Sequence, residues 1–115
     1  MIIKELAISY LRMYASKNLV AIEPMFDNNI ILRDWKIRVI GKDRALEETH
    51  KNFDAVDTLD IEVLHIYSNN DTVAAELKIV IDKIEELYVV DVITFNEEGK
   101  ITSIRAYKGR GDKEE

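Results

Sequence analysis

Apolar residues recur every three or four positions at the start of the chain, which is the pattern of an amphipathic helix. The stripe consists of Ile3, Leu6, Ala7, Tyr10, Leu11, Met13 and Tyr14. A shorter helix is expected from Asn18, a favourable N-cap, to Phe26, with Pro24 ending or kinking it. A third helix is expected after Asp43, with an inner side made of Leu46, Thr49, His50 and Phe53.

Elsewhere the apolar period is two, which predicts strands. We expect strands at residues 28–35, 37–40, 61–67, 72–82, 87–95 and 101–107, with polar turns at 68–71 and 96–99. Helices gathered before a run of antiparallel strands indicate an α+β fold. We therefore predict one domain over residues 1–115, in which a strongly curved, mostly antiparallel sheet wraps around the N-terminal helices. Such a cone encloses a pocket.

Composition and charge narrow the classes of function. Hydrophobic residues make up 47% and charged residues 33% of the 115 positions, which is typical of a globular domain. The formal net charge of −6 disfavours a nucleic-acid partner. With no cysteine and two histidines, we expect no metal and no cofactor. No apolar run is long enough for a membrane span and no signal pattern is visible, so we expect a cytoplasmic protein. Residues 109–115 are expected to be a frayed tail.

Two aspartates interrupt apolar rows. Alternation places Asp34 on the face of Ile30 and Leu32, and it places Asp91 on the face of Val89 and Ile93. An ionised carboxylate on a core face is costly unless it becomes neutral or finds a partner. Tyr10 lies on the inner stripe of the first helix, where its hydroxyl also needs a partner if it is buried. Polar groups that enter one apolar cavity from three elements predict a small-molecule site.

Each of these residues also has a purely structural interpretation. Tyr10 could be a core residue whose hydroxyl is bonded to a backbone carbonyl. Asp34 ends its strand and could face solvent. Asp91 could lie on the outer face of the sheet, because Tyr88, Val90 and Val92 make the opposite row of the strand apolar as well. The alternation alone leaves both interpretations open.

A resemblance favours the site. The stretch from Tyr10 to Trp35 resembles, without a gap, the first third of bacterial ketosteroid isomerases, which carry a Tyr and, 24 residues later, a catalytic Asp. The segment from Val90 to Ile101 resembles their penultimate strand and turn, including a second functional Asp, here Asp91. Its Phe-x-x-x-Gly-x-Ile pattern is common throughout the nuclear-transport-factor-2-like and SnoaL-like superfamily. The resemblance thus implies this fold more specifically than it implies an activity.

The resemblance implies a cofactor-independent isomerase. Asp34 would be the general base, and Tyr10 with a protonated Asp91 would donate hydrogen bonds to an enolate oxygen. The expected ligand is an apolar small molecule with a carbonyl group. Two departures, Lys108 where the family often has Trp and Trp35 where it often has Pro, argue against a steroid-shaped substrate. The residues expected to line the pocket are Phe26, Leu32, Trp35, His50, Phe53, Val89 and Ile93.

A non-catalytic role is the alternative prediction. The same fold can be a binding or dimerisation module for an apolar small molecule or a protein partner. The outer row of Tyr88, Val90 and Val92 would suit a homodimer interface on the outer face of the sheet. Light scattering tests this hypothesis, since a monomer mass in solution would contradict it.

Overall fold

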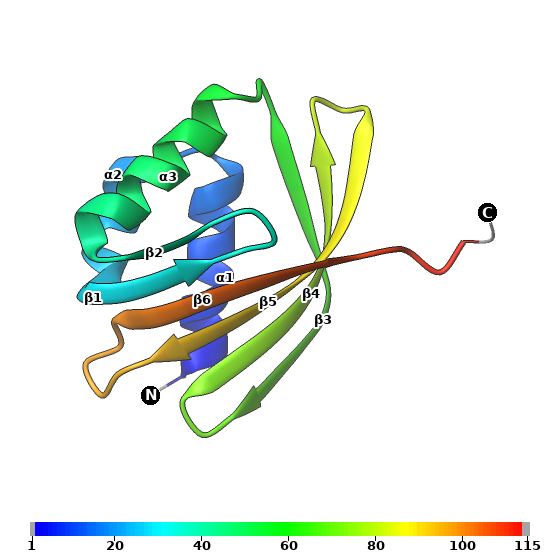
Figure 1. Ribbon diagram of the computed structural model, residues 1–115. Coiled ribbons are helices and arrows are strands. Elements are labelled where there is room, and N and C mark those ends of the chain that lie inside the picture. The colour runs from blue at the N-terminus through cyan, green and yellow to red at the C-terminus, as the bar shows by residue number, and fades with distance from the viewer. Residues whose placement is uncertain (1, 114–115) are drawn as a thin grey trace.

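A computed structural model describes residues 2–113 of the chain. Helices come first, as the sequence predicts, and strands make up most of the second half (Figure 1). The elements in order are α1 (Ile3–Ala15), α2 (Leu19–Ile22), the 3-10 turn η1 (Glu23–Met25), β1 (Phe26–Arg33), β2 (Arg38–Ile40), α3 (Lys42–Asp54), β3 (Leu59–Asn69), β4 (Thr72–Ile81), β5 (Glu85–Phe95) and β6 (Ile101–Gly109).

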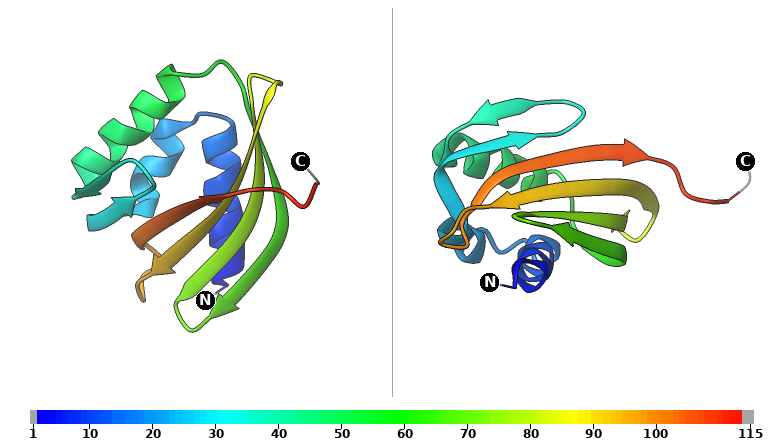
Figure 2. Two further views of the ribbon diagram at one scale, coloured as in Figure 1. Left: turned by 45° about the vertical axis from the view of Figure 1, so that its right-hand side comes forward. Right: turned by 90° about the horizontal axis from the view of Figure 1, so that it is seen from below.

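The strands form one sheet in the order β2-β1-β6-β5-β4-β3. Neighbouring strands are antiparallel except β1 and β6, which run parallel. The sheet curves around α1, which packs against β3 and β4, while α3 lies against β1 and β2 (Figure 2). This arrangement confirms the predicted α+β fold with a curved, mostly antiparallel sheet around N-terminal helices.

The core lies between the concave face of the sheet and the helices. Along β4 the inward residues Val73, Ala75 and Leu77 are fully buried, and Ile93 on β5 is buried as well. Burying a side chain such as Ile93 stabilises the fold by roughly 1.5–3 kcal/mol relative to exposing it. On α1 the buried face contains Ala7, Tyr10 and Leu11, within the predicted stripe. Asp34 and Asp91 are the two positions at which a carboxylate interrupts this apolar pattern.

Proline explains why the second helix is shorter than expected. The α-helix ends at Ile22, and the chain continues through a 3-10 turn that contains Pro24 before β1 begins at Phe26. Proline has no N–H to donate and its ring clashes with the preceding turn, so the helix cannot extend to Phe26 as predicted. The first strand accordingly starts two residues earlier than expected.

The third helix also begins differently from the prediction. It starts at Lys42, directly after Gly41, whose φ of 105° is readily adopted only by glycine. Asp43 is therefore not the N-cap and lies within the first turn, where its charge interacts favourably with the helix dipole.

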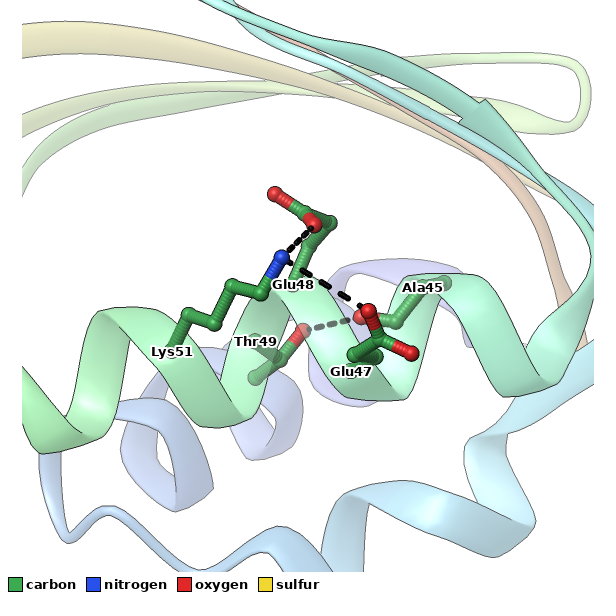
Figure 3. A network of polar contacts seen from close by, with 5 residues as sticks. All are labelled: Ala45, Glu47, Glu48, Thr49 and Lys51. Carbon is green, nitrogen blue, oxygen red and sulfur yellow. Dashed lines mark hydrogen bonds and ion pairs between the residues drawn. The ribbon is translucent and has the colours of Figure 1, made fainter.

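The inward face of α3 consists of Ala45, Thr49 and Phe53. The Thr49 hydroxyl donates to the Ala45 carbonyl at 2.8 Å, so this buried polar group is paired within the helix (Figure 3). On the outer side Lys51 forms an ion pair with Glu48 at 3.0 Å (Figure 3). The helix therefore has an apolar side and a charged side. The boundary between the two sides differs by one residue from the boundary that the sequence pattern predicted.

His50 lies on the charged side of α3, so the prediction that it lines the pocket is wrong. Its side chain is 60% exposed, and its Nε2 lies 3.2 Å from a carboxylate oxygen of Asp54. The spacing from Leu46 fits both Thr49 and His50, because residues three and four positions apart share a helix face. The buried member of this pair is Thr49.

The outer face of the sheet carries the apolar row predicted for β5. Tyr88, Val90 and Val92 are half-buried there, and Tyr67 on β3 is 61% exposed. A Cβ atom on Gly111 would come within 2.6 Å of the Tyr88 ring, so the chain after β6 lies against this face. Homodimerisation through it stays a prediction.

The expected tail is described only in part. Gly109 is still in β6, and residues 114 and 115 lie outside the described part of the chain. Fraying of residues 109–115 therefore stays a prediction. Among the helices described, none combines the length and apolar character that crossing a bilayer requires.

Candidate functional site

Asp91 lies on the concave face of the sheet, in the middle of β5. Its neighbours across the ladder are Ala75 on β4 and Ala106 on β6, and its neighbours along the inner row are Val89 and Ile93. Of the two orientations that the sequence left open, the structure has the inward one.

The Asp91 carboxyl lacks a hydrogen-bond partner among the described residues. In that part of the chain Thr58 Oγ1 is the one enclosed side-chain polar atom without a partner. The Asp91 oxygens are therefore not completely enclosed by the protein. Burial among apolar side chains raises the pKa of Asp91 to about 7, because desolvation disfavours the ionised form. Near neutral pH this carboxyl can therefore carry a proton and donate a hydrogen bond.

Asp34 follows β1 and shapes the turn into β2. Its Oδ1 accepts from the backbone N–H groups of Lys36 at 2.7 Å and Ile37 at 2.8 Å. Its own N–H donates to the Ile37 carbonyl at 3.0 Å. These bonds fix the orientation of the side chain and use only one of its two carboxylate oxygens. Oδ2 makes no hydrogen bond within the described residues.

Asp34 and Asp91 come from strands that are separated in the sheet by one strand, β6. Arg33, the last residue of β1, pairs with Arg105 in the parallel ladder. Ala106, the next residue of β6, is the partner of Asp91 on β5. Asp34 itself follows the end of this ladder and belongs to the turn.

Tyr10 approaches Asp91 from α1. It is 3% exposed, and its ring centroid lies 6.1 Å from that of Phe26. Like Asp91, its hydroxyl has no partner among the described residues and is not one of the enclosed unpaired atoms. Burial, followed by the nearby Tyr14 and Asp91, raises the pKa of Tyr10 well above its usual value. The phenol is therefore a stable neutral donor.

Tyr14 lies next to Tyr10 on α1, although the sequence interpretation treated it only as part of an apolar stripe. Its hydroxyl accepts a hydrogen bond from Asn52 Nδ2 at 3.1 Å. Burial raises the pKa of Tyr14, the Asn52 bond opposes this shift, and the charges of Asp91 and Asp34 add to it. Tyr14 therefore lies close to both carboxylates. An exposed Asn on a charged helix gives no sequence signal for such a contact.

The expected pocket residues divide into two groups. Trp35 is 44% exposed, with Lys108 Nζ 5.9 Å from its ring centroid, so it lies at the surface and is not part of the core. Side chains alternate between the two faces of the sheet only as far as the turn at Asp34. The alternation therefore does not predict on which side Trp35 lies. The others, apart from His50, lie in or beside the core: Phe26, Phe53, Val89 and Ile93 are buried and Leu32 is half-buried.

Two surface grooves lie away from these residues. The larger, of about 540 Å³, runs between α1 and β3 past Leu11, Arg12 and Ile61. The smaller, of about 340 Å³, continues from it along β3. In the described part of the chain, no group of three or more His, Asp or Glu side chains is arranged to hold a metal ion.

Comparison with known proteins agrees with this geometry. The model of the SnoaL-like domain family matches residues 7–104, which include both helical tyrosines and both aspartates. This chain belongs to the SnoaL-like family. A search of curated proteins gives no match.

Solved structures of the SnoaL-like and NTF2-like type superimpose closely. The epoxide hydrolase/cyclase-like enzyme SalBIII, described in pyran ring formation in the polyether salinomycin, is 26% identical, with a TM-score of 0.81 over 93% of this chain and 90% of that one. A candidate ketosteroid isomerase from Kribbella flavida is 11% identical, with a TM-score of 0.82 over 98% and 82%. An NTF2-like protein from Cytophaga hutchinsonii is 14% identical, with a TM-score of 0.79 over 95% and 91%.

The raised pKa of Asp91 predicts a specific pH dependence of stability. With a pKa of about 7 in the folded state and 3.8 ordinarily, the folded protein binds a proton more tightly than the unfolded chain. Stability is therefore lost as the pH rises from about 4 to 7. Asp91→Asn should remove this loss, which at about 1.4 kcal/mol per pKa unit is on the order of a few kcal/mol.

Urea unfolding at a series of pH values measures this effect. Asp91→Asn should gain stability over the unmodified protein at pH 8, and the gain should shrink towards pH 4. Parallel curves for the two proteins across this range would show that Asp91 is not held in its neutral form.

Proposed function

We propose that the protein is an acid–base enzyme that acts on an apolar small molecule with a carbonyl group and moves a proton through an enolate intermediate. One observation carries this proposal. The carboxyl groups of Asp34 and Asp91 have opposite environments: Asp34 is held by backbone amides just after the end of β1, and Asp91 lies in an apolar row of β5. Two carboxyl groups in such different surroundings are suited to different roles.

Asp34 is the base in this proposal. Its Oδ2 is free to accept a proton from the carbon next to the substrate carbonyl, while the bonds to Oδ1 keep the side chain in place. The same group can return the proton two carbons further along, which shifts the double bond into conjugation. General-base catalysis of this kind typically contributes about 10²–10⁴-fold to the rate.

Asp91 and Tyr10 are the donors to the enolate oxygen. Asp91 is able to donate because burial raises its pKa to about 7, so that a large share of the molecules carry the proton near neutral pH. Tyr10 is able to donate because its raised pKa keeps the phenol neutral. Neither group has another partner among the described residues. Donors that are in place before the reaction stabilise the developing charge, at about 2.7–4 kcal/mol for a single oxyanion donor.

Epoxide opening is a second candidate, supported by the likeness to SalBIII at 26% identity. In this reaction the protonated Asp91 gives its proton to the epoxide oxygen as the C–O bond breaks. Asp34 takes the proton of the attacking water or hydroxyl group as the new C–O bond forms. The same two residues thus serve both reactions, and the substrate distinguishes them.

Asp34→Asn tests the base without disturbing the turn. The amide oxygen of Asn can accept the same two backbone N–H groups, whereas the amide is not basic. With a small β,γ-unsaturated ketone as substrate, formation of the conjugated enone is followed by ultraviolet absorbance. Turnover should fall about 10²-fold or more in Asp34→Asn.

Asp60→Asn on the exposed side of β3 is the matched control and should turn over normally. Hydrolysis of an apolar epoxide is measured with the same three proteins. Turnover of the epoxide alone, sensitive to Asp34→Asn, would select the second candidate. No turnover of either substrate by a folded protein would contradict both and favour a non-catalytic binding module.

A further inference from the structure

Tyr14 follows Tyr10 by one helical turn and shares its face of α1. Its ring packs edge-on against Phe53 with a centroid distance of 4.8 Å, and it lies 6.0 Å from the Tyr10 ring. Contacts with an aromatic ring on α3 and another on α1 restrict the orientation of the Tyr14 ring. The hydroxyl at its end is therefore held in a defined direction.

The bond from Asn52 determines how this hydroxyl can be used. Asn52 Nδ2 donates to Tyr14 Oη at 3.1 Å. The phenolic oxygen is the acceptor, so the Tyr14 O–H proton is not used in this contact and can be donated to another group. No second partner of this hydroxyl occurs among the described residues. The Tyr14 hydroxyl can therefore donate a hydrogen bond to a group that does not belong to the described residues.

The position of Tyr14 places its hydroxyl beside the other candidate donors. Its ring lies 6.0 Å from that of Tyr10, whose hydroxyl also has no partner among the described residues. Burial first, and then the charges of Asp91 and Asp34, raise the pKa of Tyr14, which agrees with this placement. A ligand oxygen that accepts from Tyr10 would therefore also be near Tyr14.

We propose that Tyr14 donates a hydrogen bond to the oxygen of the bound ligand, and that Asn52 is a positioning residue that holds Tyr14 for this purpose. This inference rests on the proposed function in one respect, because it requires a ligand with an acceptor oxygen in the site. It extends the site to α3, so that the ligand oxygen is surrounded by groups from two helices and the sheet. It does not require that the ligand be turned over.

Binding of 2-naphthol and naphthalene tests the proposal without turnover. The two molecules have the same apolar rings, and only 2-naphthol has an oxygen. Tyr14→Phe should weaken binding of 2-naphthol about 10- to 100-fold, as expected for loss of one hydrogen bond to a partly charged oxygen. Binding of naphthalene should stay unchanged. Tyr67→Phe, an exposed tyrosine on β3, is the matched control and should bind both molecules like the unmodified protein.

Asn52→Ala tests the positioning role through a double-mutant cycle. Asn52→Ala should weaken 2-naphthol binding, and the combination with Tyr14→Phe should be no weaker than Tyr14→Phe alone. Additive losses, or an equal loss for naphthalene, would show that Asn52 only supports the fold. A Tyr14→Phe protein that binds 2-naphthol normally would overturn the proposal, as would an unmodified protein with no preference for 2-naphthol over naphthalene.

These outcomes are separable from those for the proposed function. Tyr14-dependent binding of 2-naphthol with no turnover of the unsaturated ketone or the epoxide would uphold this inference and contradict the enzyme. Turnover that is lost in Asp34→Asn, together with 2-naphthol binding that does not depend on Tyr14, would do the reverse.

Discussion

The site depends on one constraint, which is that a carboxyl group lies on the concave face of a sheet whose other inward positions are apolar. Asp91 cannot pair with the side chains beside it, because they are Ala75, Ala106, Val89 and Ile93. Keeping the charge there costs free energy, so the group holds its proton at a higher pH than an exposed aspartate does. The packed core offsets the free-energy cost of this position. Stable scaffolds commonly offset the cost of a functional site in this way.

Helix α1 complements this carboxyl from the opposite wall. Its buried face combines packing residues with two phenol groups, Tyr10 and Tyr14, so the same stripe that anchors the helix also carries hydrogen-bond donors. Asp34 follows the end of β1, where backbone amides orient it without covering both oxygens. Tyr10 and Asp91 are held by a helix and a strand, whereas Asp34 takes part in the turn that holds it. Such rigid support is what a preorganised site requires.

Several of these features were visible in the sequence because they break a local rule. A period of two identified Asp91 as an interruption of an apolar row, and the helical period identified Tyr10 as an inward tyrosine. Other features depend on contacts between distant elements and leave no local pattern. His50 and Thr49 fit the helical period equally well, and only packing against α1 and β1 decides between them. Trp35 follows a turn that ends the alternation, and the Asn52–Tyr14 bond joins two helices across 38 positions of sequence.

The most direct test of the account is the ionisation of Asp91 itself, measured by following its side-chain carboxyl ¹³C resonance with pH by NMR. We expect the resonance to titrate with a pKa of about 7, and to be absent from the spectrum of Asp91→Asn, which assigns it. A midpoint near 4 would mean that Asp91 is ionised at neutral pH. The carboxyl would then be unable to donate to a ligand oxygen, and the proposed division of roles between Asp34 and Asp91 would be wrong.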